Sequence, residues 1–362
     1  MSPDLPTDWT VVHTPEPLES EWRALETRGF GTPFQSYDWV RLFHEVQGGD
    51  GAVFVCGRSA AGELQFIAAL RLRMGALTWF GQALNNYNMP LIADDLRRAL
   101  TPEAVERIWS DVRGVLGGVS ASVLRRQPGF VGGESNPFAH WNATVEPTSA
   151  YALTLGSDWE SFYESLHSPA TRKTLRKKER WLAQEGPIDI HRISGAQAVR
   201  KHAELLLRLK SDQVHASGGR NNLASGRNRE FLVRFAAEHP ERARIYAMTQ
   251  NDVPIALAYR IENGSYPILY QMAYEPGPTA RHSPGRLLLN RVIEDAISEG
   301  HRALDFAVGD EPYKMDLCDM VTPMTIGLAA HNGAGHAPVW AERAKLALKR
   351  RIKARQGRLG AH

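Results

Sequence analysis

The chain has 362 residues, of which 43% are hydrophobic and 23% are charged. This length is comfortable for two domains, and the composition is ordinary for a soluble globular protein. No run of about 18 apolar residues occurs, which excludes a membrane-spanning helix by sequence, and the N-terminus lacks a signal-peptide pattern, so we expect a cytoplasmic protein. Cys56 and Cys318 lie far apart beside apolar patterns, which predicts free thiols. No Cys/His cluster has zinc-ligand spacing, and we expect no metal.

The first half of the chain predicts a mixed α/β domain. Thr101 is a good helix cap and Pro102 fits the first helical position, so a helix should begin there and end near Gly117. Apolar periodicity predicts two earlier helices, at 18–28 and 37–46. Predicted strands cover 10–13, 52–58, 64–73 and 120–125.

The second half repeats this plan. Helices should begin at the capping box around Asp158, at Ser168-Pro169, near Ser194 and at Pro284. Asn251-Asp252 and Asn263-Gly264 are turn signals between strands. Predicted strands cover 151–155, 244–249, 255–262, 266–275 and 304–308.

Two rounds of helices, hairpin strands, helix and strand predict a mixed, mainly antiparallel sheet flanked by helices in each half. We predict an N-terminal domain over 1–148, a C-terminal domain over 149–335 and a basic tail over 336–362. From Pro338 onward the chain has eight Lys and Arg against Glu342, a net +7, whereas the whole chain has +3. The tail should form a peripheral basic helix attracted to anionic lipid, with a disordered, solubilising tail as the alternative.

The segment Ser283-Pro284-Gly285-Arg286-Leu287 is a candidate anion site. Ser283 can cap the helix, and Gly285 leaves backbone amides open at the positive end of the helix dipole. We therefore assign Ser283, Gly285, Arg286 and Leu287 to the binding of a phosphorylated donor. The alternative is an ordinary capped helix whose leucines pack on the sheet.

A polar cluster follows the strand that begins at Leu304. Lys314 would place a fixed cation where negative charge develops during acyl transfer. Tyr313 is a candidate general acid, and Asp305 and Asp310 are candidate bases. The alternatives are a solvated lysine, a tyrosine wedged beneath the loop and an aspartate that bonds only to backbone amides.

Three further groups could bind the acceptor. Arg172, Arg176 and Arg180 recur at four-residue spacing, which puts them on one helical face and suits an anionic substrate. The alternative is the solvated face of an exposed helix. No aromatic residues interleave with these charges, so we expect no nucleic acid. Tyr274, rather than Gln271 on the opposite strand face, should face the cleft. Asn86 and Tyr87 could form a polar cleft wall, or only a turn.

Residues 283–316, the Phe34-Gln35-Ser36 segment with Trp39, and the basic run 172–180 resemble the CelD/BcsL-type acetyltransferases. These are double-domain relatives of the GNAT N-acyltransferases and the FemAB aminoacyl transferases. The resemblance covers roughly 9–330 and implies a tandem GNAT-like architecture, acetyl-CoA as co-substrate and transfer to a hydroxyl or amine of a small molecule or saccharide. It also implies that Lys314 stabilises the reacting carbonyl.

Two alternatives remain at this point. The first is FemAB-like transfer of an amino acid from aminoacyl-tRNA. The second is a catalytically degenerate scaffold in polysaccharide biosynthesis, which the single glycine at the donor turn would fit. The cluster from Asp310 to Lys314 favours an enzyme.

Overall fold

The computed structural model describes residues 5–81, 84–218, 221–264 and 266–359, without the side chains from 355 onward. The chain divides into two compact units. Unit 1 comprises Met1–Ala150, Val308–Asp310 and Val321–His362, and unit 2 comprises Tyr151–Ala307 and Glu311–Met320. The division at Ala150 lies close to the predicted boundary, but the chain from Val321 onward returns to unit 1 instead of completing the second domain. No helix within the described residues is long and apolar enough to cross a membrane.

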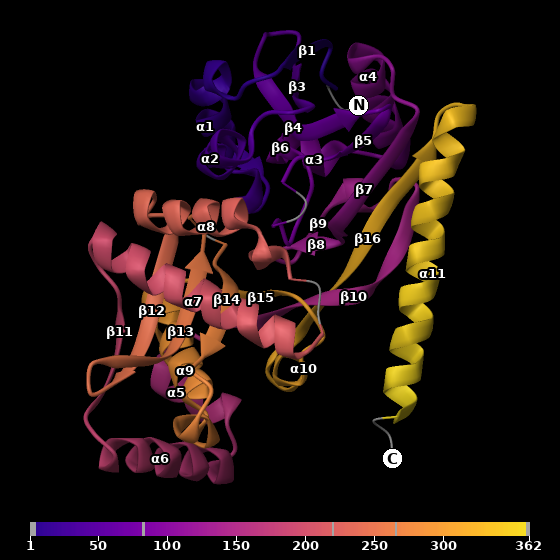
Figure 1. The fold of residues 1–362 in the computed structure, drawn as a ribbon. Helices are drawn as coiled ribbons and strands as arrows, with labels where there is room; N and C mark the ends of the chain where they lie inside the picture. Colours follow the sequence, from indigo (N-terminus) through magenta and orange to yellow (C-terminus); the bar gives the residue numbers. More distant parts are fainter. Residues whose placement is uncertain (1–4, 82–83, 219–220, 265, 360–362) are drawn as a thin grey trace. The chain divides into compact units, whose positions relative to one another are not determined.

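Unit 1 contains a mainly antiparallel sheet in the order β1-β3-β4-β5-β7-β16-β10 (Figure 1). One pair in it is parallel, because β5 pairs with β7 after the intervening helix α4. Its strands are β1 (Asp8–Val12), β3 (Ala52–Arg58), β4 (Leu64–Arg73), β5 (Ala76–Trp79), β7 (Ala121–Pro128), β16 (Met320–Ala330) and β10 (Ala143–Thr154). Short strands β2 (Gly29–Phe30) and β6 (Leu91–Ala93) pair beside β4, and β8 (Phe130–Val131) pairs with β9 (Glu134–Ser135).

The helices of unit 1 bury a largely aromatic core. Trp22, Trp39 and Trp109 are each 1% exposed. Thr101 caps α4 as predicted, since its side chain accepts a hydrogen bond from the amide of Ala104. The helices are α1 (Glu19–Arg28), α2 (Tyr37–Gln47), α3 (Asp94–Ala99), α4 (Pro102–Leu116) and α11 (His336–Leu359).

The basic tail is the helix α11 and belongs to unit 1. Val339 and Leu346 pack into a core cluster with residues of β7 and β16. Glu342, which is 3% exposed, pairs with Arg125 of β7. The predicted helix is confirmed for the described residues, and the alternative of a disordered tail is wrong for them.

Unit 2 contains a sheet in the order β10-β15-β14-β13-β12-β11. The four strands from β11 to β14 are antiparallel, whereas β15 runs parallel to β14 after the crossover helix α9. The strands are β11 (Ile188–Arg192), β12 (Ala243–Gln250), β13 (Val253–Ile261), β14 (Ile268–Tyr274) and β15 (Ala303–Val308). The helices are α5 (Trp159–Leu166), α6 (Pro169–Gln184), α7 (Ala196–Ala216), α8 (Gly226–Glu238), α9 (Pro284–Ser298) and α10 (Pro312–Leu317).

Helices cover both faces of the unit 2 sheet. Leu182 of α6 and Val292 of α9 pack in one core cluster with Ala256 and Ala258 of β13. Tyr259 has the opposite parity on β13, and its hydroxyl donates to the carbonyl of Leu232 in α8. Figure 1 shows α7 and α8 together along this second face. The predicted class, a mixed and mainly antiparallel sheet flanked by helices, is confirmed.

The parallel pair in unit 2 sets the position of the candidate site. β14 and β15 pair through Ile268 and Asp305, near the beginning of both strands. Ligands in such sheets commonly bind beyond the carboxyl ends of parallel strands, beside the start of the crossover helix. A ligand is therefore expected at the carboxyl end of β14, beside the first turn of α9.

Candidate functional site

A cavity of about 310 Å³ lies at the start of α9 in unit 2. Four elements build its wall: α7, the end of β14, the first turns of α9 with the turn before it, and the start of α10. The lining residues are Lys210, Gln213, Met272, Tyr274, Ala280, Ser283, Pro284, Gly285, Arg286, Leu289, Glu311 and Tyr313. Five residues that we predicted from sequence, Tyr274, Ser283, Gly285, Arg286 and Tyr313, thus share one cavity.

Ser283 does not cap α9 with its side chain, which corrects the sequence prediction. Its backbone is left-handed, with φ +56°, and its carbonyl accepts hydrogen bonds from the amides of Arg286 at 3.0 Å and Leu287 at 3.3 Å. The Ser283 hydroxyl instead accepts a hydrogen bond from Nζ of Lys178 in α6, at 2.7 Å. The basic helix α6 is therefore tied to the edge of the cavity.

Gly285 keeps the cavity open at the beginning of α9. A Cβ atom added there would meet only Tyr274, at 3.7 Å, so packing alone does not require a glycine. Gly285 is the second residue of the helix, where the backbone N–H has no carbonyl partner within the helix. This amide and the positive end of the helix dipole together suit a phosphate group.

Two cationic side chains add to this anion-binding character. Arg286 is half-buried in the wall, and burial lowers the pKa of its guanidinium from the ordinary value of 12.5. Burial also lowers the pKa of Lys210 on α7, while Glu311 opposes this shift. Arginine remains charged at neutral pH even after such a shift, so Arg286 supplies a fixed cation to the cavity.

The hydroxyl of Tyr313, which lines the cavity, is the candidate general acid. Burial raises its pKa above the ordinary value of 10.0, so the phenol is protonated at neutral pH and can donate. Lys314 is buried at 4% exposure and pairs with Glu311 at 2.9 Å, so it is not a solvated surface lysine. Glu311 lines the cavity, whereas Lys314 lies behind it.

The two predicted aspartate bases have other surroundings. Asp305 is 4% exposed, accepts a hydrogen bond from the amide of Ala307 at 2.5 Å and receives the hydroxyl of Tyr266. Asp310 belongs to unit 1, where it pairs with Lys353 of α11 at 2.7 Å and accepts from the amide of Ser149. These contacts are structural, which argues against both residues as general bases in the cavity of unit 2.

Leu287, Arg172 and Arg176 line a second cavity, of about 390 Å³, on another side of α9. Leu287 is 7% exposed and packs in the core, so it fits the predicted alternative of a leucine that packs on the sheet. Arg172 pairs with Glu164 at 2.7 Å. Glu160, Glu179 and Glu294 also line this cavity, so its charge is mixed.

Asn86 and Tyr87 lie in unit 1. Tyr87 is 1% exposed, and its ring packs against Phe34. The Gln35 amide donates to the Tyr87 carbonyl at 3.1 Å. A side chain this deeply packed cannot form the polar cleft wall that we predicted, which corrects the assignment of Tyr87, and Asn86 lies beside it outside the cavity of unit 2.

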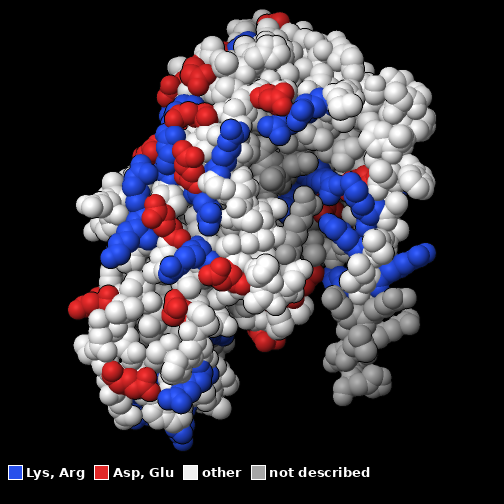
Figure 2. Space-filling model, in the orientation of Figure 1, with Lys and Arg blue, Asp and Glu red and all other residues white. Residues whose placement is uncertain are grey.

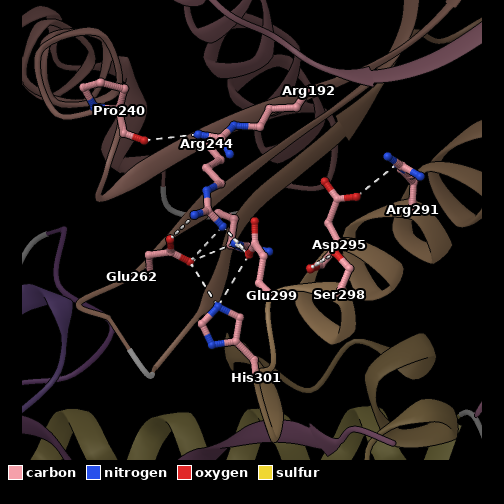
Figure 3. Close-up of polar contacts among 10 residues, drawn as sticks. Arg192, Pro240, Arg244, Glu262, Arg291, Asp295, Ser298, Glu299 and His301 are labelled. Atoms are coloured by element: carbon pink, nitrogen blue, oxygen red, sulfur yellow. Dashed lines mark hydrogen bonds and ion pairs between the residues drawn. The ribbon is translucent and has the colours of Figure 1, made fainter. Parts of the chain in front are cut away.

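A buried ion network joins β12, β13 and α9 elsewhere in unit 2. Glu262 and Glu299 both contact Arg244, and His301 lies within 3.7 Å of each carboxylate (Figure 3). These two glutamates and His301 are close enough together to ligate a cation. Arg244 and the fully buried Arg260 already bind the same carboxylates, so the network holds strands and helix together.

Comparisons with known proteins agree with this architecture. A sequence model described as an acetyltransferase (GNAT) domain matches residues 169–315. Comparison with curated protein sequences finds no match.

Three solved structures illustrate the likeness of the fold. The structure of FemX is 10% identical and covers 89% of this chain and 98% of its own, with a TM-score of 0.57. The C-terminal domain of a protein named as a lysylphosphatidylglycerol synthetase from Agrobacterium fabrum is 10% identical, with coverages of 92% and 98% and a TM-score of 0.55. L-PGS from Bacillus licheniformis is 10% identical, with coverages of 93% and 97% and a TM-score of 0.50.

Residues 169–315 thus resemble a GNAT domain in sequence, and the chain shares its fold with these three structures. At sequence identities of about 10%, similarity to these structures shows the fold and not the function. The residues that match the GNAT sequence model, 169–315, include all residues that line the cavity at the start of α9. Function therefore has to be argued from the cavity itself.

Sequence reasoning missed Lys210 and Gln213 of α7 and Glu311 before α10. Lys210 and Gln213 are three residues apart and thus share one face of α7. The amide of Gln213 donates to the Tyr274 carbonyl at 3.1 Å. The spacing of Lys210 and Gln213 on one helical face was the sequence signal that could have predicted this wall of the cavity.

Proposed function

We propose that the chain is an acyltransferase that transfers an acetyl or related acyl group from coenzyme A to a hydroxyl or amine. The observation that carries this proposal is the cavity at the start of α9, which is lined by Gly285 with its open backbone amide, Arg286, Lys210 and Tyr313. Helix starts of this kind bind phosphate groups, and coenzyme A carries a pyrophosphate. Coenzyme A would supply an activated thioester.

The chain's own residues would then divide the work. Ser283, Gly285 and Arg286 would hold the pyrophosphate. Attack by the acceptor on the thioester carbonyl forms the new ester or amide bond and breaks the C–S bond. Tyr313 would give its proton to the released thiolate and would regain, through solvent, the proton that the acceptor loses. The Glu311–Lys314 ion pair would hold the start of α10, and with it Tyr313, in place beside the cavity, so we propose Lys314 as a positioning residue.

The acceptor is a proposal from chemistry and resemblance. The cavity lined by Arg172 and Arg176 also contains Trp159 and Tyr163, a polar and aromatic lining suited to a saccharide. Because this cavity lies on another side of α9 from Tyr313, it would hold a part of the acceptor away from the reacting group. This would fit a cytoplasmic enzyme of the CelD/BcsL type that modifies a saccharide precursor.

The likeness to FemX supports a second candidate, transfer of an amino acid from aminoacyl-tRNA. The two candidates differ in the donor, because only the first requires acetyl-CoA to bind. A catalytically inactive scaffold would bind neither donor productively.

A pair of substitutions at Gly285 tests the proposed donor site. Gly285→Asp places a negative charge beside the pyrophosphate, while Gly285→Ala adds only the Cβ, for which the structure has room. Calorimetric titration with acetyl-CoA should show affinity about 10-fold or more weaker for Gly285→Asp, equal to about 1.4 kcal/mol, and a smaller change for Gly285→Ala. Equal affinity of Gly285→Asp and the parent, at native thermal stability, would refute this donor site.

A further inference from the structure

A third cavity in unit 2, of about 540 Å³, lies between the end of α6 and the 3₁₀ turn Pro278–His282. Trp181, Gln184, Glu185, Arg281 and His282 line it. His282 immediately precedes Ser283, which lines the cavity proposed for the pyrophosphate. The hydrogen bond from Lys178 to Ser283 further ties α6 to this position. The walls of the two cavities therefore adjoin at residues 282 and 283.

Trp181 gives this cavity an aromatic surface. Its side chain is 39% exposed although it is a large apolar group, and Nζ of Lys177 lies 4.4 Å from its ring centroid. The His282 ring lies 5.4 Å away on a tilted plane. An aromatic side chain of this kind can stack on a nucleic-acid base. The flexible Lys177 side chain can move from the ring to a phosphate.

His282 supplies a buried donor that lacks a protein partner. The residue is 6% exposed, and its Nε2 accepts a hydrogen bond from Nε of Arg281 at 3.0 Å. This bond assigns the proton of neutral His282 to Nδ1, which has no hydrogen-bond partner within the described residues. A buried donor without a partner is costly, and a ligand acceptor in the cavity would satisfy it.

The remaining groups fit an adenine nucleotide in particular. The Arg281 side chain is exposed at the rim of the cavity, where its guanidinium pairs with Glu185 at 3.2 Å and can also bind a phosphate. Glu185 and Gln184 offer oxygen acceptors for the exocyclic amine of adenine. The aromatic ring, the buried donor and the oxygen acceptors can thus bind the adenine base, and the cation at the rim can bind a phosphate of the same ligand.

We propose that the cavity at Trp181 and His282 binds the adenosine 3′-phosphate end of the acyl donor. This inference rests on the proposed function, because it places the nucleotide next to the pyrophosphate at Ser283 and Gly285. Trp181 stacks on the adenine, His282 donates to it, and Arg281 with Lys177 binds the 3′-phosphate.

Trp181→Ala, with Trp181→Phe as the conservative control, tests this site by calorimetry. We expect Trp181→Ala to bind acetyl-CoA about 10-fold more weakly and Trp181→Phe to retain most of the affinity. Acetyl-phosphopantetheine lacks the nucleotide and should bind the parent and Trp181→Ala equally. If the parent binds acetyl-CoA and Trp181→Ala binds it with equal affinity at native thermal stability, the nucleotide site is overturned while the proposed function stands.

Adenosine 3′,5′-bisphosphate separates the two claims if the parent does not bind acetyl-CoA, an outcome that would refute the proposed function. Binding of this nucleotide to the parent, lost in Trp181→Ala, would still establish a nucleotide site. Absence of binding, or binding that does not depend on Trp181, would overturn it.

Discussion

Nζ of Lys314 lies 2.9 Å from a carboxylate oxygen of Glu311, and only Glu311 lines the cavity at the start of α9. The pair thus connects a buried cation to the wall of the proposed donor site. Because Tyr313 lies between these two residues in sequence and lines the same cavity, the pair can fix the short helix α10 that carries the phenol.

Lys314→Met should lower turnover by about 100-fold, because the ion pair that holds Tyr313 in place is lost, and proton transfer from Tyr313 to the leaving thiolate takes place only in the transition state. Donor affinity should change by no more than a few-fold. Steady-state kinetics with calorimetry on the same protein separates the two quantities. Lys314→Arg, which keeps the charge, should restore part of the turnover. Turnover within a few-fold of the parent would show that the pair is only structural.

Lys210→Met should increase the free energy of unfolding at neutral pH relative to the parent. Burial lowers the pKa of Lys210 below 10.5, so the folded state holds its proton less tightly than the unfolded state. The parent should therefore gain stability relative to Lys210→Met as pH rises from this lowered pKa toward 10.5. Denaturant unfolding at a series of pH values measures this difference. Lys201→Met, at an exposed position of α7, is the control and should show no such trend.

Arg260→Met should destabilise unit 2 by about 3–5 kcal/mol, because Arg260 is fully buried and its removal leaves carboxylates without one of their partners. Arg291→Met on α9 is the matched control, since Arg291 is 42% exposed and pairs only near the surface. The control should cost less than about 1 kcal/mol. Urea unfolding of both variants gives the comparison, and similar losses would contradict a special role for the buried network.

The outer face of α11 should bind anionic membranes. Trp340, Leu348 and Ile352 are 73%, 59% and 48% exposed, and Figure 2 shows mainly basic side chains along this helix. Each cation near an anionic surface contributes about 1 kcal/mol, and the exposed apolar residues can enter the interface. Co-sedimentation should be stronger with anionic than with neutral vesicles.

Substitution of this outer face tests the membrane prediction better than deletion, because Val339 and Leu346 of the same helix pack in unit 1. Trp340→Ala with Leu348→Ala should reduce partitioning several-fold. Met74→Ala, at a fully exposed apolar residue elsewhere in unit 1, should match the parent. Equal partitioning of the parent and the double variant would refute the prediction.

Local signals in the sequence predicted much of the fold. Thr101-Pro102 and Ser168-Pro169 marked the starts of α4 and α6, and both hydroxyl side chains accept the expected amide hydrogen bonds. The apolar runs of β3 and β4 fall at the predicted residues. These features depend on neighbours within a few residues, which is why sequence alone can reveal them.

Contacts between distant segments escaped prediction. The return of β16 and α11 to unit 1 depends on packing with β7, about 200 residues earlier in the chain. At Ser283 the local signal for a cap was present, but Lys178 of α6 binds the hydroxyl instead. Lys210, Tyr274 and Glu311 lie far apart in sequence, and only the fold brings them to one cavity.

The most direct test of the donor site is a crystal structure of the chain in complex with acetyl-CoA. We expect the pyrophosphate within hydrogen-bonding distance of the Gly285 amide and the Arg286 side chain, with the thioester beside Tyr313. A complex in which coenzyme A binds with its pyrophosphate away from the start of α9 would contradict the account.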